Sequence, residues 1–85
     1  MNKKNFKAVL DKIQADPSCW NQSSWHCGTS HCFAGHAQIL AGKEADDTYV
    51  RQHARIFLEL NTRQANFNLE TKRTIEDFKE FLNTE

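Results

Sequence analysis

The sequence is poor in proline, glycine and large aliphatic residues, and it carries no net charge. One proline and three glycines among 85 residues leave long stretches free to form helices. Leucine, isoleucine, valine and phenylalanine together number 18, a small supply for a hydrophobic core. Eleven basic residues balance eleven acidic ones, which argues against intrinsic disorder and against a strongly basic nucleic-acid-binding domain. We therefore expect one small helical domain spanning residues 1–85.

Long apolar runs are also missing. No run approaches the roughly 20 residues that cross a bilayer, and the N-terminus lacks the hydrophobic region of a signal peptide. These absences predict a cytoplasmic protein without a membrane partner. Four lysines near the N-terminus could contact nucleic acid, but they are better explained as keeping a helix soluble. They are Lys3, Lys4, Lys7 and Lys12.

Apolar residues recur with the period of an α-helix, and no segment alternates with the period of a strand. The first stripe predicts a helix over residues 2–15, ended by Pro17. It consists of Phe6, Val9, Leu10 and Ile13. A second, largely buried helix is predicted over residues 31–41, with Thr29 or Ser30 as its cap and Gly42 after its last turn.

Three further helices are expected in the second half of the chain. One follows a cap at Asp46 or Asp47, and a short one runs from about Thr62 through Phe67. The last begins near Thr71. The third helix should place its apolar residues on one side, including His53 as a hydrogen-bonded core histidine. That side consists of Tyr49, Val50, His53, Ala54, Phe57 and Leu60.

Residues 17–29, between the first two helices, are rich in serine, tryptophan and cysteine and show no periodicity. Because a tryptophan can bury on the order of 200 Å², we expect this loop to fold back onto the helices with Trp20 and Trp25 as anchors. The fold class is thus all-α, a compact bundle of four to five short helices with a Trp/Cys-rich loop between the first two.

Cysteines and histidines are concentrated around this loop. The cluster consists of Cys19, His26, Cys27, His31, Cys32 and His36. The simplest interpretation is packing, because free cysteine behaves as a small hydrophobic residue and is often buried. Cys32 suits a buried helix, and Gly28 permits a tight turn after Cys27.

Zinc binding is a second interpretation of the cluster. Cys32 and His36 are four residues apart on one helix face, Cys27 precedes them, and Cys19 or His26 could be the fourth ligand. A structural zinc would stabilise a chain with so thin a core. The sequence contains no C-x-x-C pair, which argues against the common zinc motifs.

Two other interpretations involve the thiols themselves. A disulfide between Cys19 and Cys27 would close a short loop, but three cysteines leave one thiol unpaired and the expected compartment is reducing. Cys27 lies ahead of a helix and close to His26 and His31, so it could be the nucleophile of a thiol or redox enzyme. A chain of this size offers little concavity for such a site.

The segment W-H-C-G-T-S-H-C-F-A-G-H-A-Q-I-L-A-G resembles the signature of a group of short proteins from bacteria and their phages. That signature reads roughly W-x-x-C-G-T-x-x-C-x-A-G-x-x-x-x-L-A-G, and residues 17–42 match it best. The Trp–Cys spacing is one residue shorter here, and His36 stands where an aromatic residue is common. The resemblance implies a recurring motif at the start of a helix, and it implies no activity.

Small size, neutral charge and an aromatic loop together favour a non-enzymatic protein-interaction module, an accessory factor or inhibitor. The predicted partner-binding residues are Trp20, Trp25, His26 and His31. A zinc-stabilised module is the alternative, and a thiol enzyme comes after it. No cofactor is expected unless zinc is bound. A chain with this thin a core could also form a homodimer.

Overall fold

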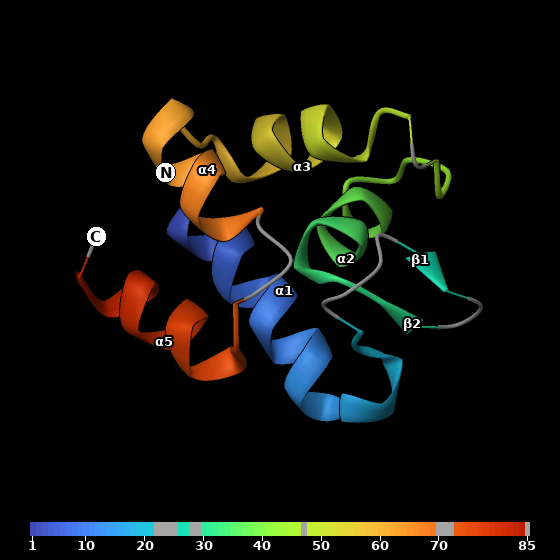
Figure 1. Ribbon diagram of the computed structural model, residues 1–85, viewed down its shortest axis with the longest axis horizontal. Helices are drawn as coiled ribbons and strands as arrows, with labels where there is room; N and C mark the ends of the chain where they lie inside the picture. The colour runs from blue at the N-terminus through green and yellow to red at the C-terminus, as the bar shows by residue number, and fades with distance from the viewer. Residues whose placement is uncertain (22–25, 28–29, 47, 70–72, 85) are drawn as a thin grey trace.

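The computed structural model describes residues 1–21, 26–27, 30–46, 48–69 and 73–84, with the backbone alone for 26, 27 and 30. This part of the chain confirms the all-α bundle, with five α-helices and one short strand pair (Figure 1). The elements are α1 (Lys3–Ala15), the 3-10 turn η1 (Pro17–Cys19), β1 (His26–Cys27), β2 (Ser30–His31), α2 (Phe33–Leu40), α3 (Val50–Leu58), α4 (Thr62–Asn68) and α5 (Ile75–Thr84).

The first helix follows its sequence prediction closely. Asn2 caps α1 by accepting a hydrogen bond from the Asn5 N–H over 2.9 Å, which satisfies a donor that the helix leaves open. All four predicted stripe residues are buried. Periodicity and capping chemistry agree here, so the helix lies where the residues predict it.

The second helix starts two residues later than predicted, and its cap is a different residue. Ser30 and His31 pair with Cys27 and His26 in a two-residue antiparallel ladder, so they are extended rather than helical. Cys32 becomes the N-cap, and its Sγ accepts the Gly35 N–H over 3.3 Å. The expected cap at Ser30 is therefore wrong, and Thr29 lies outside the described residues.

The later helices also begin at different residues from those predicted. Tyr49, not Asp46, precedes α3, because the Asp46 carboxylate accepts the Thr48 N–H in a turn of its own. The last helix begins at Ile75, where Thr74 and Asp77 exchange side-chain and backbone hydrogen bonds. Asp47 and Thr71, the other predicted starting points, lie outside the described residues.

The core is built around α1, which lies between α2 and α5 (Figure 1). Phenylalanine rings join these helices. Phe6 on α1 contacts Phe33 on α2, with ring centroids 4.7 Å apart, and Phe33 stacks on Phe78 of α5 at 4.2 Å. Stacked aromatic rings stabilise a core beyond the area that they bury, so few aliphatic residues suffice to hold the first and last helices together.

The second helix is the most enclosed, as predicted. Its first six residues are buried, and it packs against both α1 and α3. It ends at Leu40, and Gly42, two residues later, has a φ of 79°, the left-handed conformation predicted for that position. No helix in the described ranges has the length and apolarity to cross a bilayer.

Candidate functional site

The chain after η1 runs alongside β2, which brings Trp20 next to His31. These two residues form an isolated parallel bridge, and the Asn21 N–H donates to the His31 carbonyl over 2.9 Å. Trp20 is half-buried and packs against the hydrophobic core. Trp20 therefore anchors the loop as predicted, and only part of its ring remains available to a partner.

The rest of the predicted loop surface is not placed by the structure. Trp25 and the side chains of His26 and Cys27 lie outside the described residues. His31 is half-buried, and its ring lies edge-on to the ring of His36 at 5.1 Å. The predicted partner surface thus has two described members, Trp20 and His31, and both are engaged with the fold.

The predicted ligand His36 holds the loop to α2. Its side chain is buried, and Nε2 lies 2.8 Å from the backbone carbonyl of Cys19. Because a carbonyl only accepts, Nε2 must be the donor, and Nδ1 is the nitrogen through which a neutral ring could bind a metal. The contact spans 17 residues of sequence, so it fixes the loop against the bundle.

Cys32, another predicted ligand, is buried at the start of α2 with its sulfur directed at the Gly35 N–H. Within the described residues, no group of three or more His, Cys, Asp or Glu side chains is close enough to hold a metal ion. The zinc site predicted from Cys27, Cys32 and His36, with Cys19 or His26, thus includes side chains that the structure does not describe.

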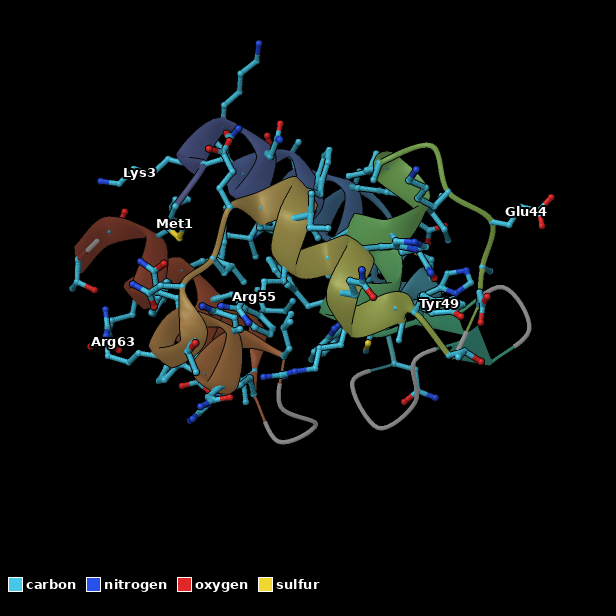
Figure 2. The ribbon with its side chains drawn as sticks, turned by 90° about the horizontal axis from the view of Figure 1, so that it is seen from above. Met1, Lys3, Glu44, Tyr49, Arg55 and Arg63 are labelled. Carbon is cyan, nitrogen blue, oxygen red and sulfur yellow. The ribbon has the colours of Figure 1, made fainter. Side chains whose placement is uncertain are left out.

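A second candidate surface lies on the outer face of α3. Ile56 on α3 is 66% exposed, and Tyr49, the residue that precedes α3, is 52% exposed. Sequence periodicity predicted Tyr49 on the buried side of the third helix, and that prediction is wrong. Figure 2 shows Tyr49 at the end of the molecule that also carries Glu44, away from Arg63.

A groove of about 430 Å³ runs beside this face, between the C-terminal end of α2 and α3. Its volume is in the range of ligand and peptide sites. Apolar atoms from α3 and from the residue that follows α2 line it together with three polar side chains. The lining residues are Ala41, Lys43, Gln52, His53, Ile56 and Phe57.

Another cavity, of about 410 Å³, lies between α4 and α5. The Arg73 guanidinium lies 3.8 Å from the centre of the Phe67 ring, and its Nε donates to the Phe67 carbonyl. Two arginines and two carboxylates line this cavity, so its charges balance and favour neither an anionic nor a cationic ligand. The lining residues are Arg63, Phe67, Arg73, Asp77, Glu80, Phe81 and Thr84. This cavity is explained by the packing of the two helices.

Sequence reasoning missed the α3 face because it considered only the apolar side of the third helix and assigned Ile56 no role. A signal exists: Ile56 follows Tyr49 by seven residues and is flanked by Arg55 on a helix whose buried positions are Val50, Ala54 and Leu58. An isoleucine outside that buried set belongs to a different face.

The chain has no match among protein-family models, curated proteins or solved structures.

Proposed function

We propose that this chain is a non-enzymatic protein-interaction module of the cytoplasm, an accessory factor or inhibitor that docks on a partner protein. The observation that supports the proposal is the exposed face of α3, where Ile56 lines a groove with a partly apolar lining and Tyr49, just before the helix, is also exposed. Large apolar and aromatic side chains at the centre of an interface supply most of its binding energy. A surface-exposed isoleucine beside a groove is suited to that role.

The loop predicted from the sequence is a second surface that could serve the same function. Trp20 and His31 lie at its base, half-buried against the bundle. A partner that binds there would contact the exposed part of Trp20 together with Trp25 and His26. The two surfaces are distinguished by separate substitutions.

Affinity capture with tagged variants tests the proposal. Ile56→Glu places a charge on the α3 face without touching the core, and Lys4→Glu on α1 is a matched control at another exposed position. We expect the wild-type chain and the control to retain the same specific partner, and Ile56→Glu to lose it. Equal capture by all three chains would contradict a role for this face, and loss in Trp25→Ala alone would assign the function to the loop.

Structural zinc binding is the second candidate, and one contact favours it. Histidines that bind zinc through one nitrogen commonly donate the other N–H to a carbonyl or carboxylate. The His36 Nε2 hydrogen bond to the Cys19 carbonyl has that form, and Cys32 lies one turn before His36. This hypothesis predicts that a chelator unfolds the protein, because the metal would supply folding free energy.

A further inference from the structure

The side chain of Gln38 holds the connection between α2 and α3 in place. It is completely buried, its Oε1 accepts the Asp46 N–H over 3.1 Å, and its Nε2 donates to the Asp46 carbonyl over 3.2 Å. Exchanging the amide oxygen and nitrogen would set donor against donor and acceptor against acceptor. The backbone N–H and carbonyl of Asp46 therefore fix the orientation of the Gln38 amide.

This orientation selects the tautomer of the His53 ring. The second N–H of Gln38 Nε2 points at His53 Nδ1 over 2.8 Å, so Nδ1 must accept. A histidine whose Nδ1 accepts carries its proton on Nε2. His53 is half-buried, and the described residues provide no hydrogen-bond partner for Nε2. The ring thus carries an N–H donor on the side away from Gln38, and His53 is one of the residues that line the groove.

The other polar side chains that line the groove carry hydrogen-bond donors, as the His53 ring does. Lys43 and Gln52 are exposed and add an ammonium and an amide, and Lys43 is the one charged side chain among the lining residues. The two described acidic residues of the connecting segment point elsewhere: Asp46 accepts the Thr48 N–H, and Glu44 projects outward (Figure 2). A cation and N–H donors around apolar atoms complement a carboxylate attached to an apolar surface.

Two exposed side chains indicate the shape of that surface. Ile56 on α3 is 66% exposed, and Tyr49, the residue that precedes α3, is 52% exposed. A second helix laid beside α3 presents its apolar residues at intervals of three, four and seven. Ile56 also lines the groove, so a helix that lies there would cover it.

We propose that the α2–α3 groove binds an acidic amphipathic helix of the partner protein. A carboxylate of that helix accepts from His53 Nε2 and pairs with Lys43, while its apolar residues cover Ile56 and Tyr49. Gln38 is a positioning residue that acts through His53 by keeping the proton on Nε2. This inference rests on the proposed function and specifies the surface and the chemistry of the partner.

A displayed library of helical amphipathic peptides, varied in charge beside a constant apolar stripe, tests the groove against the full chain. We expect selection to enrich glutamate and aspartate, and the selected peptides to bind Ile56→Glu and Lys43→Glu about tenfold or more weakly than the wild type. Lys4→Glu, which makes on α1 the same charge change as Lys43→Glu, should bind as the wild type does.

The outcomes separate this inference from the proposed function. Neutral or basic peptides enriched at the groove, or binders unaffected by Ile56→Glu, would overturn the acidic-helix proposal. Binders that require Trp25 would still support an interaction module. Selection of no binder at all would count against both.

The role of Gln38 has its own measurement. Nitrogen-15 NMR of the His53 ring in the wild-type chain should show the proton on Nε2, and Gln38→Met should allow the Nδ1–H tautomer to appear. If Gln38 has only a structural role, its substitution should change the stability of the protein and leave the His53 tautomer unchanged. If Gln38→Met does not fold, the wild-type spectrum still decides, because an Nδ1–H ring there would contradict the positioning role.

Discussion

At the scale of single residues, Cys32 acts both as a helix cap and as a core side chain. Its sulfur accepts the Gly35 N–H at the start of α2, and the residue is buried among the core side chains. Sulfur is a weak acceptor, and serine, threonine, aspartate and asparagine are the usual caps. Cys32 combines the volume of a small hydrophobic residue with a cap, a combination that a buried helix start requires.

Substitutions at Cys32 separate the cap from packing. Cys32→Ala removes the acceptor, and we expect the free energy of unfolding to fall by about 0.5–2 kcal/mol. Cys32→Ser keeps an acceptor at the same position and should lose less than Cys32→Ala. Urea denaturation followed by circular dichroism measures both, with Cys19→Ser as a control at a half-buried cysteine. Equal losses for the two Cys32 variants would show that the cap contributes nothing measurable.

The burial of Cys32 could be predicted from sequence, but its role as a cap could not. Local preference favours Thr29 or Ser30, which are better caps than cysteine. What displaces the helix start is the pairing of Ser30 with Cys27 and of His31 with His26. That pairing, together with the Asn21 hydrogen bond to His31, depends on how the loop returns to the bundle.

At the scale of elements, the buried faces of the helices follow from periodicity, whereas their ends depend on individual hydrogen bonds. The start of α4 was predicted at Thr62, and Asn61 caps it while the Gln64 side chain returns a hydrogen bond to the Asn61 N–H. Tyr49 was misplaced for the opposite reason. Its φ and ψ of −114° and 8° are not those of a helix, so its side chain does not follow the helical stripe.

The end of α3 offers a test at this scale. Glu59 adopts the left-handed conformation, with φ of 53° and ψ of 48°, and it is the one described non-glycine residue with positive φ. That conformation costs a residue with a β-carbon about 1–2 kcal/mol. The Asn2 side chain donates to the Glu59 carboxylate over 2.7 Å, but the bond is exposed and contributes little.

We therefore expect Glu59→Gly to raise the free energy of unfolding by about 0.5–1 kcal/mol, after the greater freedom of glycine in the unfolded chain is subtracted. Glu59→Ala loses the same hydrogen bond and keeps the β-carbon, so it should be less stable than the wild type. Thermal or urea unfolding compares the three chains. A glycine variant no more stable than the alanine variant would contradict the assigned backbone conformation.

At the scale of the whole molecule, stability depends on a small core joined across distant parts of the chain. The ring of Phe6 in α1 also stacks on Phe81 in α5, with centroids 5.8 Å apart, so the ends of the chain share one cluster. Sequence periodicity identifies these phenylalanines as core residues. Their pairing across the bundle depends on the arrangement of the helices, which no local pattern specifies.

Native mass spectrometry and chelation test whether this core folds without a metal. Zinc would require the loop cysteines and His36 to converge, whereas packing requires only that Cys32 cap α2 and that His36 hold the Cys19 carbonyl. The packing interpretation needs no ligand beyond the protein atoms, so under it we expect native intact mass spectrometry to give the mass of the bare reduced chain, or twice that mass for a dimer. We expect prolonged chelation to leave the helical circular dichroism unchanged.

The same spectra after denaturation, with and without reductant, separate the alternatives. A zinc-sized mass excess that disappears on denaturation would establish the metal hypothesis. The Cys32 substitutions would then test zinc ligation. Serine can act as a helix cap, but its hydroxyl cannot replace a thiolate as a zinc ligand. A mass lower by two hydrogen atoms that reductant restores would instead indicate a disulfide such as Cys19–Cys27. Either result would indicate that the loop, rather than the α3 face, is the functional part of this protein.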